Sequence, residues 1–533
     1  MGTFFKYVFI IFVIGLIVFS GYTFYKNEKK NTEETLAEKK VEEVELYDNI
    51  RLGIASYDNF NPIISKNKNV QETSKLIYDS ILTIDKDYNI QTCLATEWSK
   101  TGDLKYVVKL RENVKWHDDS EFTAEDIKFT IDKIKDPSID SIYKANVENI
   151  SEVQIIDKNT ISIILNQEVP FFEYRLIFPI IQQKYYMDED FISTAKNKVP
   201  LGTGEYKISS FDNTFVCLKE NTTWWNNTEE ERTIKTININ LYQTMGELYN
   251  AFKSNSIDFV TTSNIQWQDY IGTIGYSTKE FAGREFDYIS LNNESQIMKN
   301  KAVRKAIALA VDKTNIISNV YGGAYYVAET PNDYNASIYT KTDEAALYNV
   351  DQAKQVLVDD GWEYKYNRWQ KVENGRYLNL NITLIVNSAY EAGCIASDLI
   401  AQDLGKIGIE VTVRQVDGNQ YSKYITNKNY DMMLVAKNKS ISPDLLDYIG
   451  AGNISNYHRD EVINIFEWLK GINNDKVIKE KYDRLVQIYK EDMPFVSLYF
   501  NKNIVAYNNS LSGDITPNNF NLFYNIGYWK RQK

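Results

Sequence analysis

The chain has 533 residues, of which 43% are hydrophobic and 25% charged, and its formal net charge is −12. This composition is globular and excludes a wholly disordered or fibrous protein. The acidic balance argues against binding to duplex nucleic acid, which normally requires a basic face.

An apolar segment near the N-terminus predicts a membrane anchor. The nineteen residues 7–25 carry no charge, and a helix of that length spans about 28 Å, close to the hydrocarbon thickness of a bilayer. A cleavable signal peptide is the main alternative, but residues 21–24 do not form a small-x-small cleavage site. We therefore expect residues 1–25 to be an uncleaved single-pass anchor and the Lys- and Glu-rich residues 26–45 to be a solvated tether.

Hydrophobic periodicity predicts mixed α and β structure after the tether. Strands are expected within 153–166 and within 206–220, and a helix over 301–319. A second helix is expected to have Asp351 as its N-cap and to end before Gly361.

The pattern is clearest between residues 379 and 436. Apolar residues alternate along 379–386 and 409–416, and apolar positions at helical spacing lie between these two strands. A strand–helix–strand unit of this kind predicts parallel strands. The other elements expected here and near the C-terminus are helices over 390–406 and 418–427 and strands over 431–436, 495–500 and 504–507.

Residues that catalyse reactions or bind metals are scarce. Cys93, Cys217 and Cys394 are too far apart for a disulfide framework or a zinc knuckle. The two histidines, His117 and His458, are 341 positions apart, which leaves little basis for a multi-histidine metal site. No Walker A, H-E-x-x-H, C-x-x-C or G-x-S-x-G motif is present. We therefore expect no cofactor, and a binding protein rather than an enzyme.

Aromatic side chains are abundant, with 39 tyrosines, 24 phenylalanines and 9 tryptophans. Most are expected to pack in the core. Tyrosine is also a rigid contact residue, suited to holding a ligand by its ring face and its hydroxyl group.

Several segments match, in the same order, a pattern known from one protein family. The most specific block is 106–118 followed by 122–127, which resembles L-R-x-x-v-k-f-H-D-G…A-e-D, with Asp119 where the family has glycine. In the block 200–206, Glu205 replaces a proline of P-x-G-T-G-P-Y. Together these blocks resemble the extracellular solute-binding proteins of family 5, the oligopeptide, dipeptide and nickel receptors of ABC importers. The other matching segments are 61–63, 76–82, 94–98, 288–292, 303–312 and 353–362.

The resemblance implies a mixed α/β, two-lobed fold like that of periplasmic binding proteins, with an additional third domain and, here, a preceding transmembrane helix. Two lobes would close on a solute, and the hinge would lie where the chain crosses between them near 285 and 487. By analogy, lobe I comprises 46–72, 195–285 and 488–533, the extra domain II comprises 73–194, and lobe III comprises 286–487.

In the family's peptide receptors, an aspartate of lobe III binds the ammonium group of the peptide. The matching position here, four residues before Pro443, is Lys439, whose charge would repel an α-amino group. Three interpretations stay open: Asp444 or Asp447 compensates, Lys439 points into solvent, or the solute is anionic, N-blocked or otherwise not held by an ammonium group. The matched segments imply the ligand-binding candidates Asp58, Phe60, Tyr288, Asn292, Val435, Asn438, Lys439 and Tyr499.

These features predict an extracellular receptor, fixed to the cell membrane by one helix, that captures peptides or similar small solutes by hinge closure. Its partners would be an ABC permease and an ATPase subunit. We expect a monomer with no catalytic or metal site and no bound nucleic acid. The alternatives are a receptor that senses a ligand without import, a receptor for a nickel chelate or another non-peptide solute, and a surface hydrolase.

Overall fold

The computed structural model describes residues 45–263, 275–331, 348–470 and 475–533, together with residues 2, 20–23 and 26 near the N-terminus. The chain divides into two compact units, Met1–Leu46 with Gln532–Lys533, and Tyr47–Arg531.

The predicted anchor, 7–25, and the predicted tether, 26–45, lie mostly outside the described residues. Residues 20–23 are helical. Within the part of the chain that the structure describes, no helix is both long enough and apolar enough to cross a membrane.

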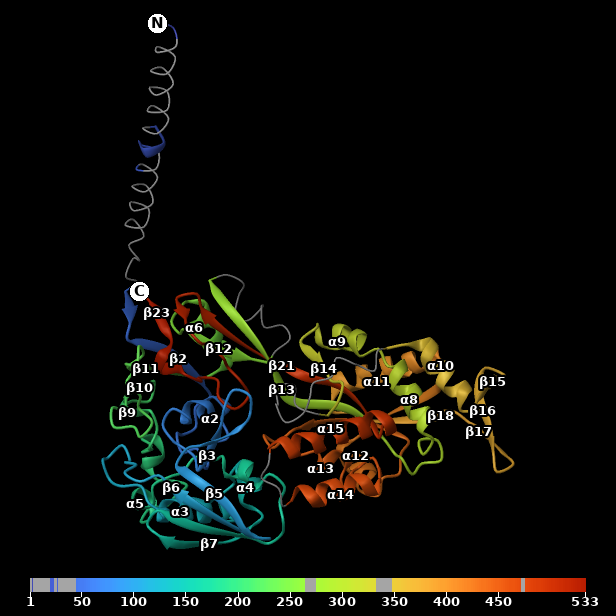
Figure 1. Cartoon of the computed structure of the whole chain (residues 1–533), viewed down its shortest axis with the longest axis horizontal. Coiled ribbons are helices and arrows are strands. Elements are labelled where there is room, and N and C mark those ends of the chain that lie inside the picture. Colours follow the sequence, from blue (N-terminus) through green and yellow to red (C-terminus); the bar gives the residue numbers. More distant parts are fainter. Residues whose placement is uncertain are drawn as a thin grey trace. The chain divides into compact units, whose positions relative to one another are not determined.

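The largest sheet of the second unit has seven strands, and two of them are much longer than the rest. β13 (Tyr276–Leu291) and β21 (Phe495–Asn508) pair antiparallel in its middle and run side by side (Figure 1). On one side, β12 (Phe259–Thr262) and β14 (Tyr325–Val327) pair with β21. On the other side, β20 (Met432–Asn438) pairs antiparallel with residues 285–291 of β13.

The predicted strand–helix–strand unit is confirmed. β18 (Asn381–Asn387) and β19 (Glu410–Val416) are parallel, and α11 (Glu391–Lys406) connects them. α12 (Gly418–Asn427) then leads to β20, which is also parallel to β18.

Two predicted helices differ from the structure in detail. The helix expected over 301–319 is two helices, α8 (Lys301–Ala310) and α9 (Lys313–Tyr321). The break occurs because Asp312 leaves the helical conformation and caps α9, accepting a hydrogen bond from the backbone of Asn315.

The expected N-cap at Asp351 is wrong. α10 (Val350–Asp359) starts two residues earlier than expected, because the side chain of Asn349 accepts the N–H of Gln352. Asp351 instead places its charge in the first turn, where the helix dipole favours it. Gly361 follows the helix with a φ of +85°, as glycine readily does.

Four predicted strand segments are divided differently in the structure. The segment 153–166 holds two strands, and so does 206–220, because short polar turns interrupt both. Conversely, 495–500 and 504–507 form one strand, since residues 501–503 stay paired with β13 and β14.

The remaining strands form smaller sheets, in which β2–β11–β10–β9, β5–β6–β8–β7, β15–β16–β17, β3–β4 and β22–β23 are neighbours. Their bounds are β2 Asn49–Ala55, β3 Leu82–Ile84, β4 Ile90–Thr92, β5 Ala95–Gly102, β6 Lys105–Leu110, β7 Ile150–Asp157, β8 Thr160–Leu165, β9 Tyr206–Phe211, β10 Phe215–Glu220, β11 Thr236–Tyr242, β15 Glu363–Lys365, β16 Arg368–Glu373, β17 Arg376–Asn379, β22 Leu511–Ser512 and β23 Lys530–Gln532. The other main helices are α2 Lys68–Ser74, α3 Ala124–Lys135, α6 Met245–Lys253, α14 Asp460–Leu469 and α15 Asp475–Asp492.

Two large hydrophobic cores share the second unit, and the division between them falls inside β13 and β21. Along β13, Phe281 belongs to the first core and Phe286 to the second. Along β21, Phe500 belongs to the second core and Val505 to the first. The two paired strands therefore run from one core into the other.

Three of the motif blocks found in the sequence, 76–82, 106–118 and 200–206, are hydrogen-bonded to one another. The Nδ1 of His117 accepts the N–H of Gly202 at 3.3 Å, and its Nε2 lies 3.1 Å from the carbonyl oxygen of Gly204. The N–H of Gly204 in turn donates to the carbonyl of Ile77 at 2.8 Å. Burial lowers the pKa of His117 to about 4, so this histidine is a neutral structural residue. Asp119 has a φ of +66°, the left-handed conformation that glycine adopts most readily.

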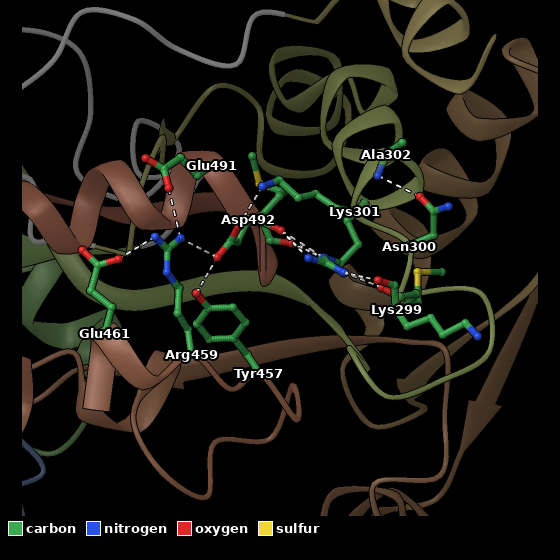
Figure 2. Close-up of polar contacts among 12 residues, drawn as sticks. Lys299, Asn300, Lys301, Ala302, Tyr457, Arg459, Glu461, Glu491 and Asp492 are labelled. Carbon is green, nitrogen blue, oxygen red and sulfur yellow. Dashed lines mark hydrogen bonds and ion pairs between the residues drawn. The ribbon is translucent and has the colours of Figure 1, made fainter. Parts of the chain in front are cut away.

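A buried arginine fixes the end of α15, just before β21 begins. The guanidinium of Arg304 on α8 is 5% exposed and donates to the backbone carbonyls of Asp492 and Met493 and to those of two residues that precede α8. The carboxylate of Asp492 binds Lys301, Arg459 and the hydroxyl of Tyr457 at 2.8–2.9 Å (Figure 2).

We predict that Arg304→Met lowers the free energy of unfolding by about 3 kcal/mol, because several buried carbonyls lose their donors. Lys301→Met, which removes a half-exposed ion pair to the same Asp492, should cost less than about 1 kcal/mol. Thermal unfolding of the two variants checks this. Equal losses would show that Arg304 does not organise this junction.

Candidate ligand-binding site at the strand crossing

The pairing of β13 and β21 is interrupted where the chain passes between the cores. The register shifts between Ala282 and Phe286, and a side chain at Gly283 would collide with the amide group of Asn501. The Oδ1 of Asn501 accepts the backbone N–H of Glu285 at 3.0 Å. A side chain amide thus replaces the missing backbone partner, and only glycine leaves room for it.

Lys439, which directly follows β20, lies against one face of β13 at this break. Its backbone N–H donates to the carbonyl of Arg284, and the Nε of Arg284 donates back to the carbonyl of Lys439, both at 2.9 Å. The Lys439 ammonium contacts the carbonyl of Pro331. It also lies 5.5–6.0 Å from the ring centres of Phe286, Tyr448 and Phe500.

Lys439 is only 7% exposed, so its side chain does not extend into solvent. Cation–π contacts and the Pro331 carbonyl hold its charge. Of the two acids near it in sequence, Asp447 pairs with Lys437. Asp444 is partly buried; desolvation raises its pKa to about 6, and its carboxylate accepts the N–H of Leu446.

The opposite face of β13 carries a carboxyl group among tyrosines. Asp287 is fully buried, and its Oδ2 accepts the hydroxyl of Tyr390 at 2.7 Å. The hydroxyl of Tyr321 lies 2.7 Å from that of Tyr390 and 3.1 Å from that of Tyr499. The ring of Tyr325 stacks on Tyr321 with centroids 3.9 Å apart. Burial raises the pKa of Asp287 to about 8, although hydrogen bonds from Tyr390 and Tyr499 oppose the shift.

The structure brings three of the predicted ligand-binding residues to this crossing. Asn438 is exposed and lies opposite Glu285 in the register, Lys439 follows it, and Tyr499 lies opposite Asp287. Val435 is 7% exposed on the same strand as Asn438. The sequence analysis missed Glu285, Asp287, Tyr321 and Tyr390. The alternation of charged and aromatic residues in 284–288 was a signal for the first two.

The other predicted residues lie elsewhere. Tyr288 is 3% exposed and packs against Phe286 and Phe495 in the second core. Asn292, just past the end of β13, donates to the carbonyls of Lys428 and Tyr430. A polar pocket of about 600 Å³ surrounds it, lined also by Thr383, Arg414, Tyr424, Asp431 and Asn456.

The two candidates near the N-terminus lie away from the crossing, and Phe60 belongs to the first core. Phe60 is fully buried, with its ring 4.9 Å from that of Tyr57. Asp58 is exposed and accepts the hydroxyl of Ser65 at 2.7 Å.

The buried Lys439 generates a stability prediction. Lys439→Asp would place a carboxylate against the Pro331 carbonyl and three aromatic faces, so we expect the free energy of unfolding to fall by about 3 kcal/mol. Lys437→Asp, at a half-exposed site, should cost about 1 kcal/mol or less. Chemical denaturation of both variants measures the difference, and an unchanged stability for Lys439→Asp would contradict the aromatic cage.

Asp287 generates a prediction about pH. Its pKa is raised on folding to about 8, so its protonated form stabilises the fold at low pH and that contribution is lost as pH rises from about 4 through 8. Asp287→Asn stays neutral throughout, so its melting temperature should gain on wild type by about 3 °C between pH 6 and pH 9. Asp403→Asn, which removes another buried carboxyl, should not reproduce the effect in melting curves.

Comparisons with known proteins agree with the fold described above. Residues 89–451 match the family model described as "Bacterial extracellular solute-binding proteins, family 5 Middle". The oligopeptide-binding protein AppA of Bacillus subtilis (strain 168) is 24% identical over 501 residues, which cover 88% of this chain and 89% of AppA.

Two solved structures show the same mixed α/β fold. The periplasmic murein tripeptide binding protein MppA, in an unliganded open form, is 16% identical with a TM-score of 0.78, covering 92% of this chain and 98% of MppA. The nickel ABC transporter protein of Bacillus halodurans is 20% identical with a TM-score of 0.75, covering 90% and 99%. The matched family consists of solute-binding proteins rather than enzymes. This chain belongs to the extracellular solute-binding proteins of family 5, the substrate-binding receptors of ABC importers.

Proposed function

We propose that this receptor is tethered to the outside of the cell membrane by its N-terminal segment and captures peptides or similar small solutes by hinge closure. It then delivers them to the permease of an ABC importer. The observation that carries the proposal is the passage of β13 and β21 between two separate cores, with a break in their pairing at residues 282–286. A paired two-strand connection whose register shifts at two nearby places, between Ala282 and Phe286 and between Asp287 and Tyr288, lets two rigid bodies rotate about a defined line.

The composition of the two cores supports the proposed division into lobes. The first core contains side chains from the segments assigned to lobe I (46–72, 195–285 and 488–533) and to domain II (73–194), whereas the second contains side chains of lobe III (286–487). Residues 495–500 also pack in the second core, so we place the second crossing within β21, between Phe500 and Val505.

Peptides are favoured as solutes because AppA is named an oligopeptide-binding protein. The crossing also offers the aromatic and polar side chains that such a solute requires. The charge of Lys439 is buried among aromatic rings, so the α-amino group of a peptide is not expected to bind there. Asn438, which is exposed and lies opposite Glu285 in the register, would instead donate to a carbonyl or carboxylate of the solute.

The test is native mass spectrometry of the purified full chain after incubation with an equimolar peptide library, with nickel–histidine as a second sample. We expect peptide adducts, and a smaller radius of gyration by X-ray scattering when peptide is present. Binding of nickel–histidine alone would replace the peptide assignment. Peptide hydrolysis over hours would contradict a receptor without catalysis.

The hinge can be tested separately with two glycine variants. Gly283→Ala would displace the Asn501 amide from the Glu285 N–H, so we expect at least about a tenfold loss of peptide affinity by isothermal titration calorimetry. Gly405→Ala in α11 meets no neighbouring atom and should bind peptide like wild type. Equal affinities for the two variants would exclude a role for the break in closure.

A further inference from the structure

The buried carboxyl group of Asp287 is not paired with any basic side chain that the structure describes. Its Oδ1 is buried and has no hydrogen-bond partner among the residues that the structure describes. Among the ion pairs of the same residues, none includes Asp287 or its neighbour Glu285. An unsatisfied buried acceptor costs about 1–3 kcal/mol, and such a group in a folded protein calls for an explanation.

Glu285 adds a second carboxyl group to the same face of β13. Residues 285 and 287 are two apart in a strand, so their side chains point to the same side. Glu285 is partly exposed, and its pKa is raised by burial. The charge of Glu285 also raises the pKa of Asp287, so the two acids would be costly to maintain side by side if they had only a packing role.

The aromatic surroundings suit a cation. Tyr321, Tyr325, Tyr390 and Tyr499 come from α9, β14, the residue before α11, and β21. Their ring faces carry negative potential and their hydroxyl groups accept hydrogen bonds, a combination that binds ammonium groups. Tyr325, Tyr390 and Glu285 are partly exposed, whereas Asp287, Tyr321 and Tyr499 are buried. Solvent therefore reaches the partly exposed residues of this group but not the buried ones.

We propose that Glu285 and Asp287, enclosed by these four tyrosines, bind a primary ammonium group of the solute on the face of β13 opposite Lys439. This inference rests on the proposed function and names the solute class as cationic. The amine displaces the ring of Tyr325 or Tyr390 and donates to Oδ1 of Asp287.

Binding should depend on pH. At neutral pH the carboxyl group of Asp287 is mostly protonated, because burial raises its pKa to about 8, and an ammonium group binds the ionised form. The titratable groups that face it are Glu285 on its own strand and the tyrosines 321, 325, 390, 421 and 499, whose pKa values all lie above the ordinary value for tyrosine. The affinity for an amine should therefore rise with pH up to about 8 and then level off.

The test uses two pentapeptides that are acetylated and amidated, Ala-Ala-Lys-Ala-Ala and the same sequence with norleucine in place of lysine. Calorimetry with the full chain should show that the lysine peptide binds at least about tenfold more tightly at pH 8.5, and that the preference shrinks about tenfold per pH unit below 7. Asp287→Asn should abolish the preference for the lysine peptide over the norleucine peptide. Asp403→Asn is the matched control and should retain it.

A second measurement does not depend on any variant. At pH 7.5, the lysine peptide should release about 0.8 proton on binding to wild type, measured by titration in buffers of different ionisation enthalpy, and the norleucine peptide should release none. Absence of proton release, or a lysine preference that survives in Asp287→Asn, would overturn the inference. So would binding of neither pentapeptide while the peptide library still binds. Failure of the library to bind would instead contradict the proposed function itself.

Discussion

The pairing of β13 with β21 is the constraint on which the rest of the molecule depends. Each of these two strands contributes side chains to both of the large hydrophobic cores and so connects them. The other features described at the crossing act on this strand pair. Gly283 and Asn501 shape its break, and Arg304 fixes the end of α15 from which β21 starts. A receptor of this kind needs two bodies that move relative to each other while their connection remains ordered, and a paired ribbon meets both needs.

The two faces of β13 at the break differ in charge although they belong to one strand. Because side chains alternate in a strand, Phe286 packs beside the Lys439 ammonium whereas Glu285 and Asp287 point to the other side. Lys439 supplies the cation on one face. On the other face, no basic side chain among the described residues forms an ion pair with the carboxyl groups. An ammonium group of a solute would therefore be attracted to the face of Glu285 and Asp287.

Much of the fold could be predicted from the sequence because its signals are local. The alternation in 379–386 and 409–416 predicted β18 and β19, and Gly361 marked the end of α10. The site was less predictable, because its residues come from β13, α9, α11 and β21, and their contact depends on register. Nothing local to Tyr321 or Tyr390 shows that their hydroxyl groups meet. Lys439 was identified by its place in a motif, but its burial depends on rings distant in sequence.

The left-handed conformation of Asp119 has a consequence for which residues this position tolerates. Its φ of +66° is one that aspartate adopts less readily than glycine, and that a β-branched residue adopts only with strain. The turn lies beside His117, whose ring binds the backbone of a second block. A β-branched residue at position 119 would therefore disturb the contact between the two blocks, so backbone conformation restricts substitution here more than side-chain chemistry does.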